Sequence, residues 1–334
     1  MLQLKMNEYK GHKMPHEEHT QTLGMEDIIE RLFVMRKQEE KRYKCRDYLS
    51  DDSNIEFTSQ ANNQNMLSRR DSRESKTARN NGVDKFCREQ IVEWSFRVVD
   101  YFHMNREVVA IATSYLDRFL ANYDCDRRTF KLAATTALYL AIKLNDAHKT
   151  DMMNVLSDLS RGEFVLRDIV RMETFMIETL SWLLNPPTSS CFVGHILKLV
   201  PKSTCSSYAR KLSALATFFT ELSLCDYDFT TTKPSTIAMA AVLNAIEILS
   251  LTDFSFNHQD NFLQQVSVVL DIECDSHELV ECKQKLWAVY GRSEESALHE
   301  NLEFISTYKS NKKSIQNSKS SSSNHTSPVC ISRT

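Results

Sequence analysis

Glycine is scarce in this sequence: there are six in 334 residues, and they are scattered along the chain. Loops that hold dinucleotide or triphosphate groups need several glycines within one short run. No such run occurs, which argues against a nucleotide-binding enzyme. The sequence also has no Ser/His/Asp, Cys/His or paired-carboxylate motif that resembles a catalytic family. We therefore expect a protein that is not an enzyme and uses no cofactor.

Paired cysteines are absent, although the chain has nine cysteines in all. None belongs to a CxxC pair, which zinc ribbons and redox motifs require. Single thiols in odd number suit a reducing compartment. His12, His16 and His19 lie close together, but Pro15 interrupts any helix there, and no cage of cysteine or carboxylate ligands is evident. We expect no metal site.

Long apolar runs and a strong net charge are missing as well. No stretch approaches the roughly 18 apolar residues that a membrane span needs, and the start, MLQLKMNEYKGHKMP, is polar rather than secretory. The formal net charge of −3 gives no general attraction to nucleic acid. We expect a soluble protein of the nucleus and/or cytoplasm, without a membrane or nucleic-acid partner.

What the sequence does contain is helical periodicity, most clearly from Asp84 to Asp146, where neither proline nor glycine occurs. Asp84 and Asn105 can cap the first two helices, and a third follows Asp126. The third has a small inner face, which lets neighbouring helices approach closely: Ala133, Ala137 and Ala141. The first has the apolar stripe Cys87, Ile91, Trp94, Val98 and Phe102. This region predicts a compact helical domain around a central helix.

The remaining pattern predicts an all-α protein with a second unit of similar design. After the central helix come a short helix in DMMNVLSDLS and a longer one from Val165 to Leu183, and Pro186 and Pro187 then mark a boundary. Five further helical patterns follow: Phe192–Val200, Tyr208–Leu224, Ser235–Leu249, Asn261–Leu270 and His277–Tyr290. KPSTIAMAAVLNAIEIL aligns with FKLAATTALYLAIKL, which indicates a duplicated five-helix unit.

Composition divides the chain into six parts. We expect a flexible N-terminus at 1–24, an N-terminal helical segment at 25–50, a polar linker at 51–82, the two five-helix units at 83–185 and 186–292, and a disordered Ser/Lys-rich tail at 293–334. Ser72 in the linker and Ser327 before Pro328 fit common phosphorylation patterns, and both patterns have high false-positive rates.

Three motifs in the first unit together resemble the cyclin box. CREQIVEW resembles its opening motif, YLDRFL its second helix and LAIKLND its third, and the resemblance covers roughly Phe86 to Tyr290. It implies two tandem cyclin folds in a non-catalytic subunit that binds and activates a cyclin-dependent Ser/Thr protein kinase, in cell-cycle control. Kinase substrates would be further partners. The cues to subtype, among A, B and D types, cancel.

The resemblance implies roles for three groups of residues. Arg88 of the opening motif would form a buried ion pair with Asp117 of the second helix. Lys143 and Glu173 would bind the kinase around its αC helix, with the apolar contacts Leu140, Leu144, Ile177, Trp182 and Leu184 around them. Simpler alternatives are a helix-terminal cation for Lys143 and a solvated helix face for Glu173.

The third group departs from the family. Many cyclins bind substrates bearing an RxL motif through a patch on the first helix, and the corresponding positions here are Cys87, Gln90, Ile91, Trp94 and Arg97. Gln90 replaces an aliphatic residue, and Arg97 stands where an acidic residue often receives the substrate's arginine. Repulsion then replaces attraction, so we expect weak or altered RxL docking.

Two questions stay open at this level. RDYLSDDSN, from Arg46 to Asn54, fits the RxxLxxxxN destruction-box pattern, but Tyr43, Cys45, Tyr48 and Leu49 also suit the apolar side of a helix that precedes the box. The alternatives to a kinase activator are a cyclin-fold transcription factor, which would be expected to bring a zinc ribbon and basic surfaces, and a retinoblastoma-like peptide-binding scaffold.

Overall fold

The computed structural model describes residues 24–49, 82–145, 152–160, 162–201, 204–249 and 256–293. Within these ranges the chain forms α-helices and short 3-10 turns and no β-strand, which confirms the all-α prediction. The histidine group at the start, Ser72, Ser327, and most of the expected linker and tail lie outside the described residues.

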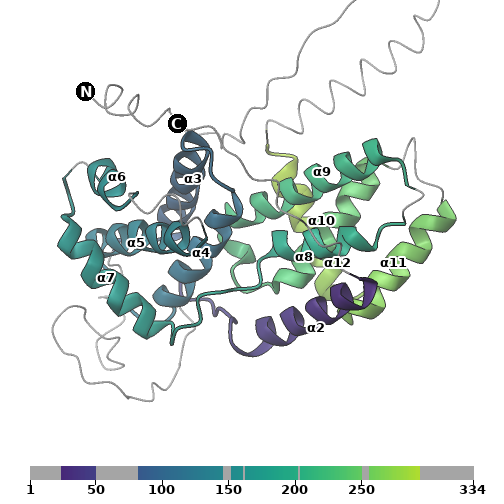
Figure 1. Cartoon of the computed structure of the whole chain (residues 1–334), viewed down its shortest axis with the longest axis horizontal. Coiled ribbons are helices and arrows are strands. Elements are labelled where there is room, and N and C mark those ends of the chain that lie inside the picture. Colours follow the sequence, from purple (N-terminus) through teal and green to yellow (C-terminus); the bar gives the residue numbers. More distant parts are fainter. Residues whose placement is uncertain are drawn as a thin grey trace, which may run out of the picture.

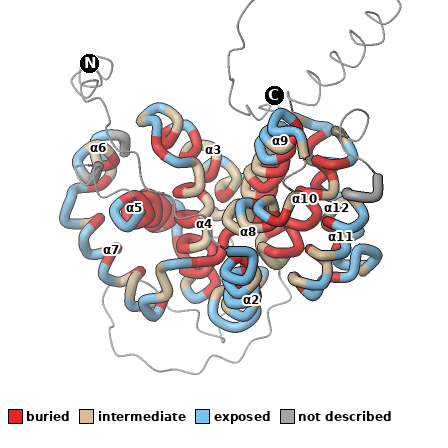
Figure 2. The backbone as a smooth tube through the Cα atoms, turned by 45° about the vertical axis from the view of Figure 1, so that its right-hand side comes forward, coloured by how far each residue is buried: buried red, intermediate tan, exposed pale blue. Residues whose placement is uncertain are grey.

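The first five-helix unit consists of α3 (Lys85–Tyr101), α4 (Glu107–Leu120), α5 (Arg127–Asn145), α6 (Met152–Leu159) and α7 (Leu166–Thr179). Helix α5 lies at its centre between α4 and α7 (Figure 1). Every residue of α5 from Ala133 to Ile142 is buried, so this helix is red along most of its length in Figure 2. Its alanines let the neighbouring helices pack closely, as the sequence predicts.

The second unit repeats this arrangement with α8 (Ser189–Ile196), α9 (Ser206–Leu224), α10 (Pro234–Leu249), α11 (Phe256–Leu270) and α12 (His277–Tyr290), together with 3-10 turns at Leu197–Leu199 and Tyr227–Phe229. Helix α10 takes the central place and packs against α8, α9 and α12. The two units lie side by side (Figure 1). The buried prolines Pro186 and Pro187 belong to the segment between α7 and α8 that joins them.

Two predicted helix features are wrong in detail. The helix expected to reach Leu183 ends at Thr179, because Ser181 and Trp182 adopt positive φ angles of 51° and 61° and turn the chain away. On α3 the buried apolar residues are Val92, Phe96, Val98 and Val99, so Val98 is buried as predicted. Arg88 on the same helix is buried, while the other members of the predicted stripe are only partly buried: Cys87, Ile91, Trp94 and Phe102.

The N-terminal helix α2 (Met25–Lys41) packs on the second unit, against α8 and α11 (Figure 1). The helix was expected to continue through Tyr43, Cys45, Tyr48 and Leu49, and that expectation is wrong. From Arg42 to Leu49 the chain is non-helical and crosses from the second unit to the first. We call residues 42–49 the connecting segment. The Tyr48 side chain is buried at the junction of the two units, and this contact replaces the expected helical backbone.

One buried carboxylate fixes α2 to the second unit. Glu39 is 3% exposed and accepts hydrogen bonds from the Ser235 amide, at 2.9 Å, and from the Ser235 hydroxyl. Ser235 lies in the first turn of α10, where a negative charge is favourable. Arg36 pairs with the same carboxylate at 2.9 Å, so the charge of Glu39 is compensated although it is buried.

We expect Glu39→Ala to release α2 from the second unit. Loss of a buried hydrogen bond to a charged group costs about 1.5–3 kcal/mol, equivalent to a roughly 10- to 150-fold rise in local opening. Limited trypsin digestion, which cleaves after Arg36 or Lys37, would measure this rise. Glu40→Ala is the matched control, because Glu40 is half-exposed and pairs with Arg36 at 3.5 Å only. Equal cleavage rates for the two variants would contradict the role given to Glu39.

Candidate functional site

Lys143 and Glu173 meet on the surface of the first unit. Lys143 lies in the last turn of α5 and Glu173 lies midway along α7, and packing of these helices brings the Nζ and Oε1 atoms to 2.9 Å. The side chain of Lys143 is 42% exposed, whereas that of Glu173 is 10% exposed. The pair therefore presents an ammonium group to solvent and holds its carboxylate partner beneath.

The surroundings keep Lys143 charged and oriented. Its hydrogen bond to Glu173 raises the pKa of Lys143, with the nearby negative charge acting in the same direction. The ring of Tyr139 lies 5.6 Å from the ammonium nitrogen, within range of a cation–π contact. Glu173 is buried, so the alternative of a solvated helix face does not describe it.

Exposed apolar side chains accompany this pair. Leu144 is 50% exposed and Trp182 is 74% exposed, whereas Ile177 and Leu184 are half-buried against the core. Leu140, which was expected to be a contact, is 1% exposed and belongs to the core, so we withdraw it from the contact set. Because α5 is buried on nearly all sides, its sequence does not indicate which of its leucines reaches the surface.

Sequence reasoning also missed apolar residues on α7. Leu166 and Val170 are exposed by 41% and 45% and share a helix face with Glu173 and Ile177, at spacings of three to four residues. The helical spacing of these residues is visible in the sequence, but apolar residues that face a core have the same spacing. We give one name, the α5–α7 surface, to the following set: Lys143, Leu144, Leu166, Val170, Glu173, Ile177 and Trp182. Exposed apolar side chains beside a charged pair suit an amphipathic helix of another protein.

Arg88 and Asp117 lie together inside the protein, with an Nη2–Oδ2 distance of 2.9 Å and side-chain exposures of 2% and 7%. Burial alone would lower the pKa of Arg88, but the charge and hydrogen bonds of Asp117 outweigh it and the net shift is upward. Tyr48 donates to the same carboxylate at 2.8 Å, and Arg88 donates to the Leu224 carbonyl of the second unit. The pair therefore joins both units and the connecting segment.

The expected docking positions lie along one side of α3. Gln90 and Arg97 are exposed, while Cys87, Ile91 and Trp94 are half-buried against the core. Glu93, between them, accepts a hydrogen bond from Gln90 at 3.3 Å and pairs with Arg97 at 3.6 Å. The Glu93 carboxylate thus already has partners on α3, namely Gln90 and Arg97.

We expect an RxL peptide to bind this chain at least about tenfold more weakly than it binds a cyclin with an intact patch, because an incoming arginine meets Arg97. Fluorescence anisotropy with a labelled RxL peptide would measure this. The variant Arg97→Glu/Gln90→Leu, which restores the usual residue types, should strengthen binding. Tight binding by the native chain that is lost in Trp94→Ala would contradict the prediction.

The described part of RDYLSDDSN is folded against the protein. Arg46 donates a hydrogen bond to the Ala121 carbonyl at the end of α4, and the amides of Tyr48 and Leu49 each donate to the Tyr227 hydroxyl at 3.0 Å. The rings of Tyr48 and Tyr227 meet edge to face at 5.3 Å. Recognition of this motif by another protein would require these contacts to open.

Other kinds of site find no support in the described residues. No group of three or more His, Cys, Asp or Glu side chains there is arranged to hold a metal ion. The eight cysteines in the described ranges are free thiols. Among the helices described, none is both long and apolar enough to cross a membrane.

Two family models match the chain. One, "Cyclin, N-terminal domain", covers residues 55–185, and the other, "Cyclin, C-terminal domain", covers residues 187–323. Their junction falls at the prolines between the two five-helix units. The matches therefore assign each unit to one of the two parts of this family.

Individual relatives are more distant. The G2/mitotic-specific cyclin-2 of Medicago sativa is 29% identical over 163 residues, which cover 49% of this chain and 48% of that protein. The G2/mitotic-specific cyclin-A1 of Caenorhabditis elegans is 26% identical over 48% of this chain and 31% of that protein. The chain thus spans about half the length of these curated relatives, or less. A crystal structure of a viral cyclin from herpesvirus saimiri covers 62% of this chain and 89% of its own, with a TM-score of 0.47 and 15% identity.

Proposed function

Because this chain belongs to the cyclin family, we propose that it is the regulatory subunit of a cyclin-dependent Ser/Thr protein kinase and that it binds the kinase through the α5–α7 surface. The observation that carries the proposal is the Lys143–Glu173 pair at 2.9 Å, set among exposed apolar side chains. The Lys143 ammonium group faces outward, is held by a buried carboxylate and has apolar side chains around it. Such a surface supports binding of a helix that carries both acidic and apolar residues.

The proposed mechanism is positional. A protein kinase is active only when the glutamate of its αC helix reaches the lysine that holds the ATP phosphates. Leu144, Val170 and Trp182 would bury apolar residues of αC, while Lys143 would donate to one of its polar groups and fix its rotation. The active conformation then gains the free energy of this contact, and the inactive one does not. The catalytic groups, ATP and magnesium belong to the kinase, and this chain performs no chemical step.

The relatives support a place in cell division. The Medicago sativa and Caenorhabditis elegans proteins both carry "G2/mitotic-specific" in their names, and by analogy we propose that this chain acts in cell-cycle control, in the nucleus and/or cytoplasm. Following the level of the protein through a synchronised division cycle would test this. A constant level with constant associated kinase activity would count against a mitotic role.

A single exposed side chain tests the surface. We expect Trp182→Ala to weaken kinase binding at least about tenfold, because aromatic residues at the centre of an interface often contribute about 2 kcal/mol or more. Calorimetric titration against a panel of purified cyclin-dependent kinases, with phosphate transfer to a peptide substrate as second readout, would measure this. Since Trp182 is 74% exposed, its loss should leave stability nearly unchanged.

Val268→Ala is the matched control. Val268 is 75% exposed and apolar like Trp182, but it lies on α11 of the second unit. We expect this variant to bind as the native chain does. If Trp182→Ala also bound and activated a kinase normally, the kinase would not use the α5–α7 surface as proposed; if no kinase bound the native chain, the proposed function itself would fail.

A further inference from the structure

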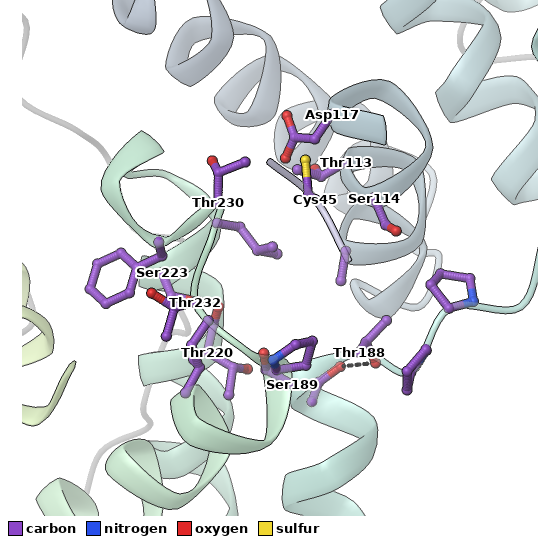
Figure 3. Close-up of a pocket in the computed structure, with 18 of the residues that line it drawn as sticks. Cys45, Thr113, Ser114, Asp117, Thr188, Ser189, Thr220, Ser223, Thr230 and Thr232 are labelled. Carbon is purple, nitrogen blue, oxygen red and sulfur yellow. Dashed lines mark hydrogen bonds between the residues drawn. The ribbon is translucent and has the colours of Figure 1, made fainter. Parts of the chain in front are cut away.

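A cavity of about 640 Å³ lies between the two units, away from the α5–α7 surface. Its walls come from the end of α2, the connecting segment, Arg88 of α3, α4, the Pro186–Thr188 link with the start of α8, α9 and the start of α10. Hydroxyl side chains are unusually frequent among the lining residues. Figure 3 shows them on facing walls, with Thr113 and Ser114 on α4 opposite Thr220, Ser223, Thr230 and Thr232. Its volume falls within the range of about 300–1,000 Å³ that is usual for ligand pockets.

Arg118 lines this cavity and carries a buried charge without an acid beside it. The residue is 6% exposed. Its Nε donates to the Ser114 carbonyl at 3.1 Å and its Nη2 to the Leu183 carbonyl at 2.9 Å, and its guanidinium lies 4.9 Å from the centre of the Tyr43 ring. Within the described ranges no carboxylate lies at ion-pair distance and Nη1 donates no hydrogen bond. Burial lowers the pKa of Arg118; Tyr43, Tyr115 and Cys45 act in the opposite direction without reversing the shift, and no carboxylate contributes.

Most other charges around the cavity are already compensated. Arg88 pairs with Asp117 at 2.9 Å, and Arg106 pairs with Glu221 at 3.0 Å. Glu39 is held by Arg36. The Arg118 cation therefore stands out from its neighbours, since burying an uncompensated charge is costly.

Further groups in the lining are open to a ligand. Lys44 and Lys233 have no ion-pair partner among the described side chains, and the Thr230 hydroxyl oxygen is buried without a hydrogen bond there. The lining also contains six acids, of which four pair with arginines: Glu39, Glu40, Asp117 and Glu221. The other two have no ion-pair partner among the described side chains: Glu107 accepts from Thr188 at 2.7 Å, and Glu278 accepts from Thr236 at 3.3 Å. The cavity thus offers cationic and hydroxyl donors beside walls that already contain negative charge.

This charge pattern favours a monoanion. Three lining cations have no ion-pair partner among the described side chains: Arg118, Lys44 and Lys233. They face two such acids, Glu107 and Glu278, which leaves a balance of one positive charge. An Arg–carboxylate contact is bidentate and strong when buried. A phosphate monoester carries nearly two charges at pH 7 and would be repelled more strongly by Glu107 and the other lining acids. The hydroxyl groups suit the backbone of an inserted peptide, as donors and acceptors.

We propose that the cavity between the two units binds an acidic segment of a kinase substrate, with one Asp or Glu carboxylate of that segment paired to Arg118. Lys44 and Lys233 would contact neighbouring acidic residues. Such a site would give this chain a means of substrate selection that we do not expect from the altered face of α3. Identification of the bound protein as a substrate rests on the proposed function, whereas binding of the acidic segment does not.

The first experiment uses the full chain without a kinase. Fluorescein-labelled hexaglutamate should bind saturably and hexaglutamine should not. Arg118→Gln and Lys233→Glu should each weaken hexaglutamate binding about tenfold or more. Arg210→Gln, which makes the same change at an exposed site near the start of α9 and outside the cavity lining, should leave it unchanged. Lys233→Glu keeps the test decisive if Arg118→Gln fails to fold, which thermal unfolding would show.

Three results would overturn the site: equal binding of hexaglutamine, hexaglutamate binding that neither Arg118→Gln nor Lys233→Glu weakens, or much tighter binding of a phosphoserine hexapeptide, which would assign the cavity to phosphate.

The second experiment tests the link to substrates. With an active kinase complex, a substrate peptide that ends in hexaglutamate should show a KM about tenfold below that of the same peptide ending in hexaglutamine, and Arg118→Gln should remove the difference. If hexaglutamate binds the chain but KM does not respond, the substrate assignment is wrong. If hexaglutamate binds but no kinase associates, the proposed function fails and the binding site stands.

Discussion

Exchanging the two charges of the surface pair, in Lys143→Glu/Glu173→Lys, is expected to abolish kinase binding without lowering the unfolding temperature by more than a few degrees. The side chains lie 2.9 Å apart, so the exchanged residues can form an ion pair of the opposite sense. The outward group becomes a carboxylate. A kinase helix selected for contact with an ammonium then meets a like charge, which typically costs several kcal/mol.

The double variant is a sharper test than either single change. The Glu173 side chain is only 10% exposed, so Glu173→Lys alone would bury a cation next to Lys143 and destabilise α7. Lys143→Glu alone would place two carboxylates together. Either could lose binding by local unfolding. In the exchanged pair the internal contact is kept and only the external charge is reversed, so lost affinity can be attributed to the surface.

Calorimetry should show at least about a hundredfold loss of affinity for the exchanged variant, together with loss of kinase activation. The control is the exposed pair Lys131–Glu163, at 3.1 Å, which also joins the start of α5 to the loop before α7. Exchanging those charges should affect neither binding nor stability. Native affinity in Lys143→Glu/Glu173→Lys would remove the pair from the interface.

The second unit shows how much of the fold the sequence can predict. The helix expected at Tyr208–Leu224 is observed from Ser206 to Leu224, and the one expected at His277–Tyr290 is observed over the same residues. In both, local periodicity and burial agree. At Ser181 and Trp182 they do not agree, because the positive φ angles there depend on how the chain must turn toward Pro186. Nothing in the residue types requires that turn.

The connecting segment was misassigned for a related reason. Tyr43, Cys45, Tyr48 and Leu49 can be placed on one face of a helix, but the observed path is set by distant partners. Tyr48 lies between Asp117 of the first unit and Tyr227 of the second, residues 69 and 179 positions away. A single sequence contains no measure of such contacts, and each is strong enough to overcome a weak helical preference.

The candidate site was also predicted only in part from the sequence. Motifs predicted that Lys143 and Glu173 share a function, and packing of α5 on α7 explains how they meet. Exposure was not predictable. Leu140 and Leu144 belong to the same motif and lie one helical turn apart, yet one is 1% and the other 50% exposed, because α5 is buried on all sides from Ala133 to Ile142 and exposed in its last residues.

We expect Arg88→Ala to destabilise the whole protein, because it breaks a buried ion pair at the junction of the two units. Arg88 is 2% exposed, and its removal leaves Asp117 buried without a cation and the Leu224 carbonyl without this donor. Breaking one side of a buried pair typically costs about 3–5 kcal/mol. At about 2–4 °C per kcal/mol, the unfolding temperature should fall by roughly 6–20 °C.

Lys85→Ala is the control for Arg88→Ala. Lys85 lies one turn earlier on α3 and also bridges to the second unit, at 2.7 Å from Asp228, but both side chains are more than half exposed. Such pairs contribute about 0–1 kcal/mol, so Lys85→Ala should shift unfolding by only a few degrees. Similar shifts for the two variants, measured by calorimetry, would show that burial of the Arg88 pair is not what joins the units.

Arg88→Ala also separates stability from recognition. Arg88 lies at the junction of the units and not on the α5–α7 surface, so any loss of kinase binding should come from unfolding. At a temperature well below its transition, the folded fraction of Arg88→Ala should bind the kinase with native affinity. Weak binding by fully folded Arg88→Ala would mean that the junction sets the geometry of the α5–α7 surface, since the residue itself cannot reach a partner from inside the protein.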